Sequence, residues 1–426
     1  FQFYHLQDIQ NITILKGAEA AMYGSMGSNG VILIETDGTA SNDLETRVSY
    51  YGSYGINWND KRMPVMGLDD YKQYLADMGM TISKDPQNFY NNFPFMQNPN
   101  DPRYNYLYNN NTDWQDEIYR TAVSHDHNVT VTGGLKNMPY RLSFGYTDQQ
   151  GILKTSDFER YTLSVNLNPK FFDDHLTFNI NGKGMIANTR YADTGAIGSA
   201  VRMDPTQSVY SDDPKYDNFD GYFQWVKTGA DLNDPTWPYT AERNAVANPV
   251  AQLYTVDDRA KSKSLVGNIE VDYKVHGLED LRIHMNFGGD FSTGRQTYYA
   301  SPSSFGSNTY YGRTGYEQID KYNLSYNAYA QYMKDFNEKH HFDIMAGYEW
   351  QHFHHEGDND YYGLYPETNQ AVDDAGNSLA GSKYNHTFKK WASENYLVSF
   401  FGRANYSLLD RYLFTATVRY DGSSRF

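Results

Sequence analysis

Apolar and polar residues alternate along much of this chain, and this alternation limits the folds that the chain can adopt. Residues 160–168 show the alternation most clearly. In a strand, one face of this segment would carry Tyr161, Leu163, Val165 and Leu167. The opposite face would carry Arg160, Thr162, Ser164, Asn166 and Asn168. A period of two residues is typical of a β-strand with one apolar and one polar face.

The same alternation recurs along the whole chain and predicts about eleven strands. Most would have a length near the roughly 9–11 residues that cross a bilayer at a tilt. The predicted spans are 45–56, 126–134, 139–148, 158–169, 174–190, 262–275, 280–294, 319–333, 340–355, 395–407 and 410–420.

The connections between these strands alternate between short and long. The short ones are 134–139, 170–173, 276–279, 334–339 and 408–409. The long ones are 57–125, 148–157, 191–261, 294–318 and 356–394. Outer-membrane barrels have short periplasmic turns and long outer loops, whereas a Greek-key sandwich has no reason for this parity. The polar faces also carry charges such as Lys183 and Arg403, which need water or polar protein beside them.

Composition supports the same interpretation and excludes several classes of protein. No run of about 18 apolar residues offers a transmembrane helix. The chain has no cysteine, which excludes disulfides and thiolate sites. Its 52 acidic and 36 basic residues give a formal charge of −16, which argues against a nucleic-acid partner. The 40 tyrosines suit half-wet places such as a membrane interface.

The first part of the chain differs from the rest. Ala18, Ala20 and Ala21 predict a short helix, a glycine-rich turn follows, and 31–36 reads as a strand. The turn lacks the lysine of a phosphate-binding loop, so we interpret its glycines as a tight turn. This segment predicts a small α+β unit over 1–40, ahead of an all-β unit over 41–426.

Three stretches of the chain carry recognisable motifs. The first is "LQDIQNITILKGAEAAMYGSMGSNGVILIETDG", the second contains "HNVTVTGG", "YRLSFGYTDQQGIL" and "DFERYTLSVNLN", and the third is "FGRANYSLLDRYLFTATVRYDGSSRF". Together they resemble the SusC/RagA-like branch of TonB-dependent outer-membrane transporters. The first is similar to the end of that family's plug domain, the second to its early barrel strands and the third to its mid-barrel segment. Ala18-Glu19 departs mildly from the family pattern. The plug residues that carry the match are Lys16, Gly17, Tyr23, Gly24, Gly27, Asn29 and Gly30.

The resemblance implies a plug followed by a barrel of about 22 strands. The chain would then be the C-terminal part of the plug plus the first half of an antiparallel transmembrane β-barrel in a Gram-negative outer membrane. It also implies TonB-dependent import of an oligomeric glycan or peptide. The implied partners are a SusD-like surface lipoprotein, outer-membrane lipid, and TonB through a segment upstream of Phe1. No cofactor, enzymatic activity or nucleic acid is implied. The alternatives are a passive porin, a surface glycan-binding module, or a soluble carbohydrate-active sandwich.

Some residues in or near the long outer loops are candidates for binding. Aromatic residues beside amides and carboxylates suit a sugar, and they suit a peptide or a partner protein nearly as well; loop self-packing is the alternative. The candidates are Trp225, Trp237, Tyr239 and Trp391. A weak candidate for a calcium site is formed by four carboxylates, with a solvated acidic loop as the alternative. They are Asp212, Asp213, Asp217 and Asp220.

Two histidines near the predicted end of a strand are a further candidate. His352 and His354 would share a strand face beside Glu356, and we interpret them as solvated side chains rather than metal ligands. Residues 68–79 predict a helix.

Overall fold

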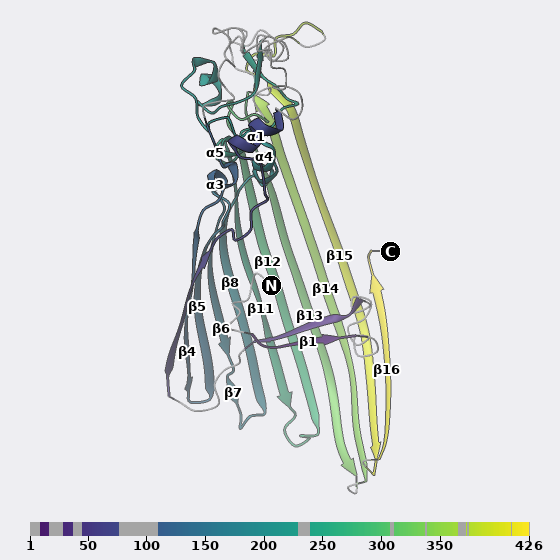
Figure 1. Ribbon diagram of the computed structural model, residues 1–426. Coiled ribbons are helices and arrows are strands. Elements are labelled where there is room, and N and C mark those ends of the chain that lie inside the picture. The colour runs from purple at the N-terminus through teal and green to yellow at the C-terminus, as the bar shows by residue number, and fades with distance from the viewer. Residues whose placement is uncertain are drawn as a thin grey trace, which may run out of the picture.

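Eleven long strands form one antiparallel wall in the computed structural model (Figure 1). The structure describes residues 9–16, 29–36, 45–75, 110–228, 239–306, 311–336, 339–364, 372, 375–409 and 411–425. The strands of the wall are β3 (Arg47–Asn57), β4 (Ala122–Leu135), β5 (Met138–Gln150), β6 (Asp157–Leu167), β8 (Leu176–Tyr191), β11 (Val256–Lys274), β12 (Leu281–Ala300), β13 (Arg313–Phe336), β14 (His340–Leu364), β15 (Lys383–Leu408) and β16 (Tyr412–Ser423).

Each of these strands pairs with its neighbour in sequence, from β3 at one edge to β16 at the other. The two-residue strand β7 (Lys170–Phe171) adds a short pairing with β8. This meander confirms the eleven predicted strands and the alternation of short turns with long connections. An antiparallel meander with that parity places all short turns at one end of the wall and all long connections at the other.

The later strands extend beyond their predicted ends. β13, β14 and β15 have 24, 25 and 26 residues, whereas β3 has 11. A membrane crossing needs only about 9–11 residues. Most of the additional residues lie at the end with the long connections, so these strands are much longer than a membrane crossing would require. The predicted loop 356–394 is therefore largely strand.

The two faces of the wall differ as the alternation predicts. Leu163 is 53% exposed, whereas its neighbours Thr162 and Ser164 are buried. Directly paired residues share a face, so the register extends this assignment from β6 across the sheet. We define the outer face as the one carrying Leu163, Leu265 and Phe291, and the inner face as the one carrying Thr162 and Ser164.

A separate hairpin precedes the wall. β1 (Ile9–Leu15) pairs antiparallel with β2 (Val31–Thr36), and neither belongs to the wall sheet. The strand at 31–36 is confirmed, whereas β1 was missed although Ile12 and Ile14 alternate with threonine and asparagine. Gly30 precedes β2 with φ +95°, and a Cβ there would meet the Leu15 carbonyl at 3.1 Å. Glycine is thus required for the chain to enter β2.

Short helices gather at the end with the long connections (Figure 1). They are α1 (Leu68–Leu75), α3 (Trp114–Ile118), α4 (Gly195–Arg202), the 3₁₀ helix η6 (Pro214–Phe219) and α5 (Pro249–Tyr254). α1 confirms the predicted helix over the described part of 68–79. The two-stranded sheet of β9 (Val226–Thr228) and β10 (Tyr239–Ala241) belongs to one of the long connections. In the described part of the chain, no helix has the length and apolar character needed to cross a membrane.

Candidate functional site

The long connections fold into a small globular cap with its own hydrophobic core. Three connections supply its buried residues, a fourth adds the partly buried Phe305, and this composition was not predicted from the sequence. The fully buried core consists of Trp114, Ile118, Leu153, Ala196, Ala200, Met203, Tyr216, Phe219, Phe223, Ala241, Val250 and Leu253. Because a packed core resists deformation, the cap presents a defined surface at this end of the wall.

Helix α3 anchors the cap through one face. Trp114 and Ile118 are buried, and the Trp114 Nε1 donates to the Asp204 carbonyl at 2.9 Å. Asp113 is the N-cap, and its carboxylate accepts the backbone N–H groups of Gln115 and Asp116. An aspartate at this position satisfies two N–H groups that the helix itself leaves unpaired.

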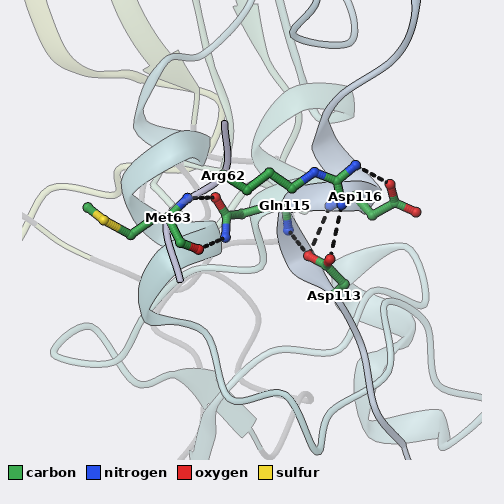
Figure 2. Close-up of polar contacts among 5 residues, drawn as sticks. All are labelled: Arg62, Met63, Asp113, Gln115 and Asp116. Atoms are coloured by element: carbon green, nitrogen blue, oxygen red, sulfur yellow. Dashed lines mark hydrogen bonds and ion pairs between the residues drawn. The ribbon is translucent and has the colours of Figure 1, made fainter. Parts of the chain in front are cut away.

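The segment after β3 is fastened to α3 by side chains (Figure 2). Arg62 forms ion pairs with Asp113 at 3.0 Å and with Asp116 at 2.6 Å. Gln115 donates to the Met63 carbonyl at 2.7 Å and accepts the Met63 N–H at 3.0 Å. The hydrogen bond to Asp116 raises the pKa of the Arg62 guanidinium. Because Arg62 is exposed, these contacts mainly fix position and add little stability.

Asn248 joins three parts of the cap. It is fully buried, and its Nδ2 donates to the carbonyls of Val209 at 2.9 Å and Phe223 at 3.1 Å. Its Oδ1 accepts the N–H groups of Val250 at 3.0 Å and Ala251 at 3.2 Å, which caps α5. The amide therefore uses both N–H donors and both acceptor positions, as a buried asparagine requires.

Tyr222 is a partly buried residue packed against the cap core. It forms an isolated bridge with Tyr210, and their rings lie 4.8 Å apart. Burial raises the pKa of the Tyr222 hydroxyl, and its hydrogen bond with Tyr210 acts in the same direction. The Tyr222 side chain therefore stays neutral at every physiological pH.

The inner face of the wall below the cap carries a ladder of hydrogen-bonded amides. Asn166 of β6 bonds to Asn181 of β8, which donates to Asn268 of β11 at 3.2 Å. Asn268 in turn donates to Asn286 of β12 at 3.3 Å. Further along the same face, Arg419 pairs with Glu349 at 2.6 Å. A sheet that is polar on this face and apolar on the other separates an aqueous interior from lipid.

Aromatic and cationic side chains line the inner face near the cap. Tyr298 and Tyr361 meet edge to face at 6.3 Å, and the Arg313 guanidinium lies 5.6 Å from the Tyr361 ring. Trp391 meets His355 edge to face at 4.5 Å. This arrangement offers flat apolar surfaces beside hydrogen-bond donors at the mouth of the interior.

Comparison with known proteins identifies the family. The chain is 46% identical over 422 residues to the "TonB-dependent receptor SusC" of Bacteroides thetaiotaomicron, an alignment that covers 98% of this chain and 39% of that protein. The chain belongs to the SusC/RagA-like TonB-dependent transporters. Family membership confirms the resemblance noted in the sequence, and it places the protein in the outer membrane.

Other relatives agree with this family assignment. A TonB-dependent receptor of Formosa agariphila is 28% identical, with 98% of this chain and 39% of that protein covered. The solved structure of the RagAB peptide transporter has the same fold, with a TM-score of 0.72 at 20% identity over 98% of this chain and 47% of that one. The chain thus spans about two fifths of the length of the curated relatives. No protein-family model matches it.

The seven residues that were predicted to belong to a plug are placed only in part in this SusC/RagA-like chain. Lys16 follows β1, and Asn29 and Gly30 lead into β2, so three of the seven lie at one end of the β1–β2 hairpin. The other four, together with the predicted helix near Ala20, lie outside the described residues. Those four are Gly17, Tyr23, Gly24 and Gly27.

The structure separates the aromatic candidates. Trp225 is half-buried against the cap core, with its ring edge-on to Phe223 at 5.2 Å. Tyr239 begins β10, and its side chain lies outside the described part of the chain, as does the whole of Trp237. Trp391 lies within β15 rather than in a loop, on the inner face and 38% exposed. Of the candidates whose side chains are described, Trp391 is therefore the one that faces the interior.

The calcium candidate is not supported. Asp213 caps η6 and pairs with the buried Lys215 at 3.0 Å, and Asp220 bonds to Ser303. Neither Asp212 nor Asp217 joins them in a metal-binding cluster, and within the described ranges no three His, Cys, Asp or Glu side chains are placed to hold a metal ion. Asp212, Asp217 and Asp220 are exposed, which agrees with the alternative of a solvated acidic loop.

The expectation that the histidines lie at a strand end was wrong. β14 continues to Leu364, so His352 and His354 lie within the strand. His352 is buried, contacts Glu394 at 2.8 Å and stacks on Tyr396 at 4.4 Å. The predicted sharing of a face is confirmed, because both imidazoles contact the Tyr322 ring.

Proposed function

We propose that the full-length protein actively imports an oligomeric nutrient, a glycan or a peptide, across the outer membrane with energy supplied through TonB. The observation that carries this proposal is the 46% identity to a TonB-dependent receptor over 98% of the chain. The structure of the RagAB peptide transporter supports it at the level of the fold. In this proposal, residues 1–40 end the plug, and residues 41–426 form the first half of the barrel.

The two faces of the wall suit this role. The amide ladder and the ion pairs of the inner face need a polar neighbour, which a plug or a water-filled path would supply. The cap and the mouth residues lie at the end with the long connections, which is the extracellular end in a barrel of this parity. We propose that a SusD-like lipoprotein docks on this side and that Trp391 contacts substrate.

Deleting the gene tests the import. We expect a strain without it to lose growth on one class of oligomer, either glycans or peptides, and to keep growth on the monomers. A protonophore that collapses the inner-membrane gradient should abolish uptake of the labelled oligomer in the parent strain. Uptake that persists with the protonophore would instead indicate a passive porin.

Trp391→Ala tests the proposed contact within the mouth. We expect weaker capture of the oligomer with normal amounts of assembled protein, because Trp391 is part of the surface rather than the core. Tyr396→Ala on the outer face of the same strand is a matched control that should leave capture unchanged. Equal effects of the two substitutions would contradict the assignment of Trp391.

A further inference from the structure

A cationic hollow lies on the outer face of β8, β11 and β12, on the side of the wall that faces lipid. Arg259, Lys261 and Lys263 alternate along β11 and are all exposed. Arg190 of β8 is paired with Arg259, and Arg295 of β12 is paired with Lys261. These side chains line a hollow of about 760 Å³. Five cations from three adjacent strands stand out in a chain with a formal charge of −16.

An apolar groove of about 720 Å³ adjoins this hollow. Its walls include Leu163, Leu265 and Phe291, and Lys263 lines both spaces. Gly184 leaves the room for it, because a Cβ there would meet nothing closer than the Ser264 carbonyl at 4.0 Å. The groove is thus a strip of the lipid-facing surface in which a glycine, with no side chain, stands between larger residues.

The height of the hollow follows from the register. Leu265 pairs with Phe291, and both are exposed apolar residues at the upper end of the lipid-facing rows of β11 and β12. The next outward residues are Lys263 and Thr293, followed by Lys261 and Arg295. Two residues of a strand span about 7 Å. The cations therefore lie where the hydrocarbon ends and the headgroups begin, on the extracellular side.

The acidic residues near the hollow already have partners. Asp157 pairs with Arg120 at 2.7 Å, and Glu159 accepts hydrogen bonds from Tyr161 and Asn188. Asp257 lies between Arg190 and Arg259, at 3.1 and 2.9 Å.

Three cations of the hollow have no such carboxylate. Among the residues that the structure describes, Lys261, Lys263 and Arg295 form no ion pair with an Asp or Glu side chain. Arg295 instead lies over the Tyr316 ring at 4.2 Å and donates to Gln318 at 3.3 Å. These three side chains thus leave positive charge for an external anion.

We infer that the hollow and the groove together bind one phosphate-bearing lipid of the outer leaflet. The phosphate would lie among Lys261, Lys263 and Arg295, and an acyl chain would lie over Gly184. Charge above an apolar strip matches an anionic amphiphile better than it matches a protein, which would have to enter the bilayer to reach the groove. This lipid would hold β8, β11 and β12 at a fixed depth, independently of what the protein transports.

Native mass spectrometry of the full-length protein in nonionic detergent tests the inference. The protein is incubated with equal amounts of phosphatidic acid and phosphatidylcholine that have the same acyl chains. We expect one tightly held phosphatidic acid, retained at least about tenfold over phosphatidylcholine. Because each cation near a membrane surface contributes about one kilocalorie per mole, Lys263→Gln should lower the retention of phosphatidic acid roughly fivefold. The triple change K261Q/K263Q/R295Q should lower it beyond tenfold.

Two further variants separate charge from shape. Gly184→Leu fills the groove without changing a charge, and we expect it to reduce retention of the lipid. Lys390→Gln removes an exposed cation from the outer face of β15, away from the hollow, and should change nothing. Unchanged heat-modifiable mobility on gels shows that each variant is assembled.

Several results would overturn the inference. Equal retention of the two lipids would show that phosphate is not recognised. Equal losses in Lys263→Gln and Lys390→Gln would show that the hollow is not the site. Displacement of the lipid by excess inorganic phosphate would indicate a site for free anions instead.

Discussion

The wall and the cap of this protein are built on opposite plans. In the wall, large apolar side chains such as Leu163 and Phe291 point outward and are about half exposed, while the inner face carries amides and ion pairs. In the cap, Trp114, Tyr216 and Leu253 are buried together. Apolar side chains therefore lie on the outside of the wall but on the inside of the cap, because the wall faces lipid and the cap faces water. Lipid makes outward leucine favourable, and water makes it costly.

The largest expected effect comes from the cap core. Trp114→Ala should destabilise the cap by about 3–5 kcal/mol, because it empties a fully packed site. Hydrogen exchange should then accelerate over 195–226 and 245–254 while the wall strands stay protected. Trp58→Ala is the matched control, because Trp58 is 62% exposed and should have little effect. Faster exchange in β11–β14 would show that the cap and the wall do not fold as separate units.

A charge on the lipid face should have the next largest effect. Leu163→Arg should cost about 2–4 kcal/mol of folding free energy in the bilayer if the site lies at mid-depth. Denaturant titration of the full-length protein in lipid vesicles measures this cost, and Leu163→Ala is the uncharged control.

Spin labels test the same register directly. A label at 163 should be accessible to oxygen and a label at 164 to a water-soluble relaxation agent. The opposite pattern would mean that the two faces have been exchanged.

Loss of the α3 cap should have a smaller effect. Asp113→Ala removes the N-cap, and we expect it to cost about 0.5–2 kcal/mol in the stability of the cap. Asp113→Asn keeps the capping oxygen but loses the charge beside Arg62, so it should cost much less. Local hydrogen exchange at Gln115 and Asp116 compares the two variants. A similar loss in both would mean that the ion pair, rather than the capping bond, holds α3.

The smallest effect should appear in a turn at the opposite end of the wall. The Gly277 N–H donates to the Glu279 carboxylate at 2.9 Å and lowers the pKa of that side chain. Because the pKa of Glu279 is lower in the folded turn, its carboxylate stabilises the turn at pH values above the unfolded pKa of about 4.3. This stabilisation is lost as the pH falls through the pKa of the folded state.

Amide exchange at Gly277 measures this pH dependence. Relative to the turn at Lys136, Gly277 should lose protection as the medium is acidified. Glu279→Gln should remove the difference between the two turns. An acid-dependent loss that persists in Glu279→Gln would assign the effect to another group, such as His175, which lies 3.7 Å from Glu279.

The strands were predicted correctly where one face meets lipid and the other a polar interior. Above the membrane the prediction failed. The alternation over 340–355 and 395–407 reports one lipid face and one polar face, so these spans were found. Beyond His355 both faces meet water, and the pattern disappears although the ladder continues to Leu364. Cross-strand contacts such as His386 with Asp360 at 2.7 Å support this extension, and they join residues far apart in sequence.

The order of the strands, the parity of the connections and the face that each wall residue occupies all follow from the alternating pattern of the amino-acid sequence. These properties are local, because a residue's face depends on its position in an alternating run. Three groupings emerge only from the three-dimensional structure: the loop residues that form the cap core, the three segments that Asn248 joins, and the hollow that Arg190, Lys261 and Arg295 line together. Those groupings depend on register between distant strands and on packing between loops, and no short stretch of sequence encodes either.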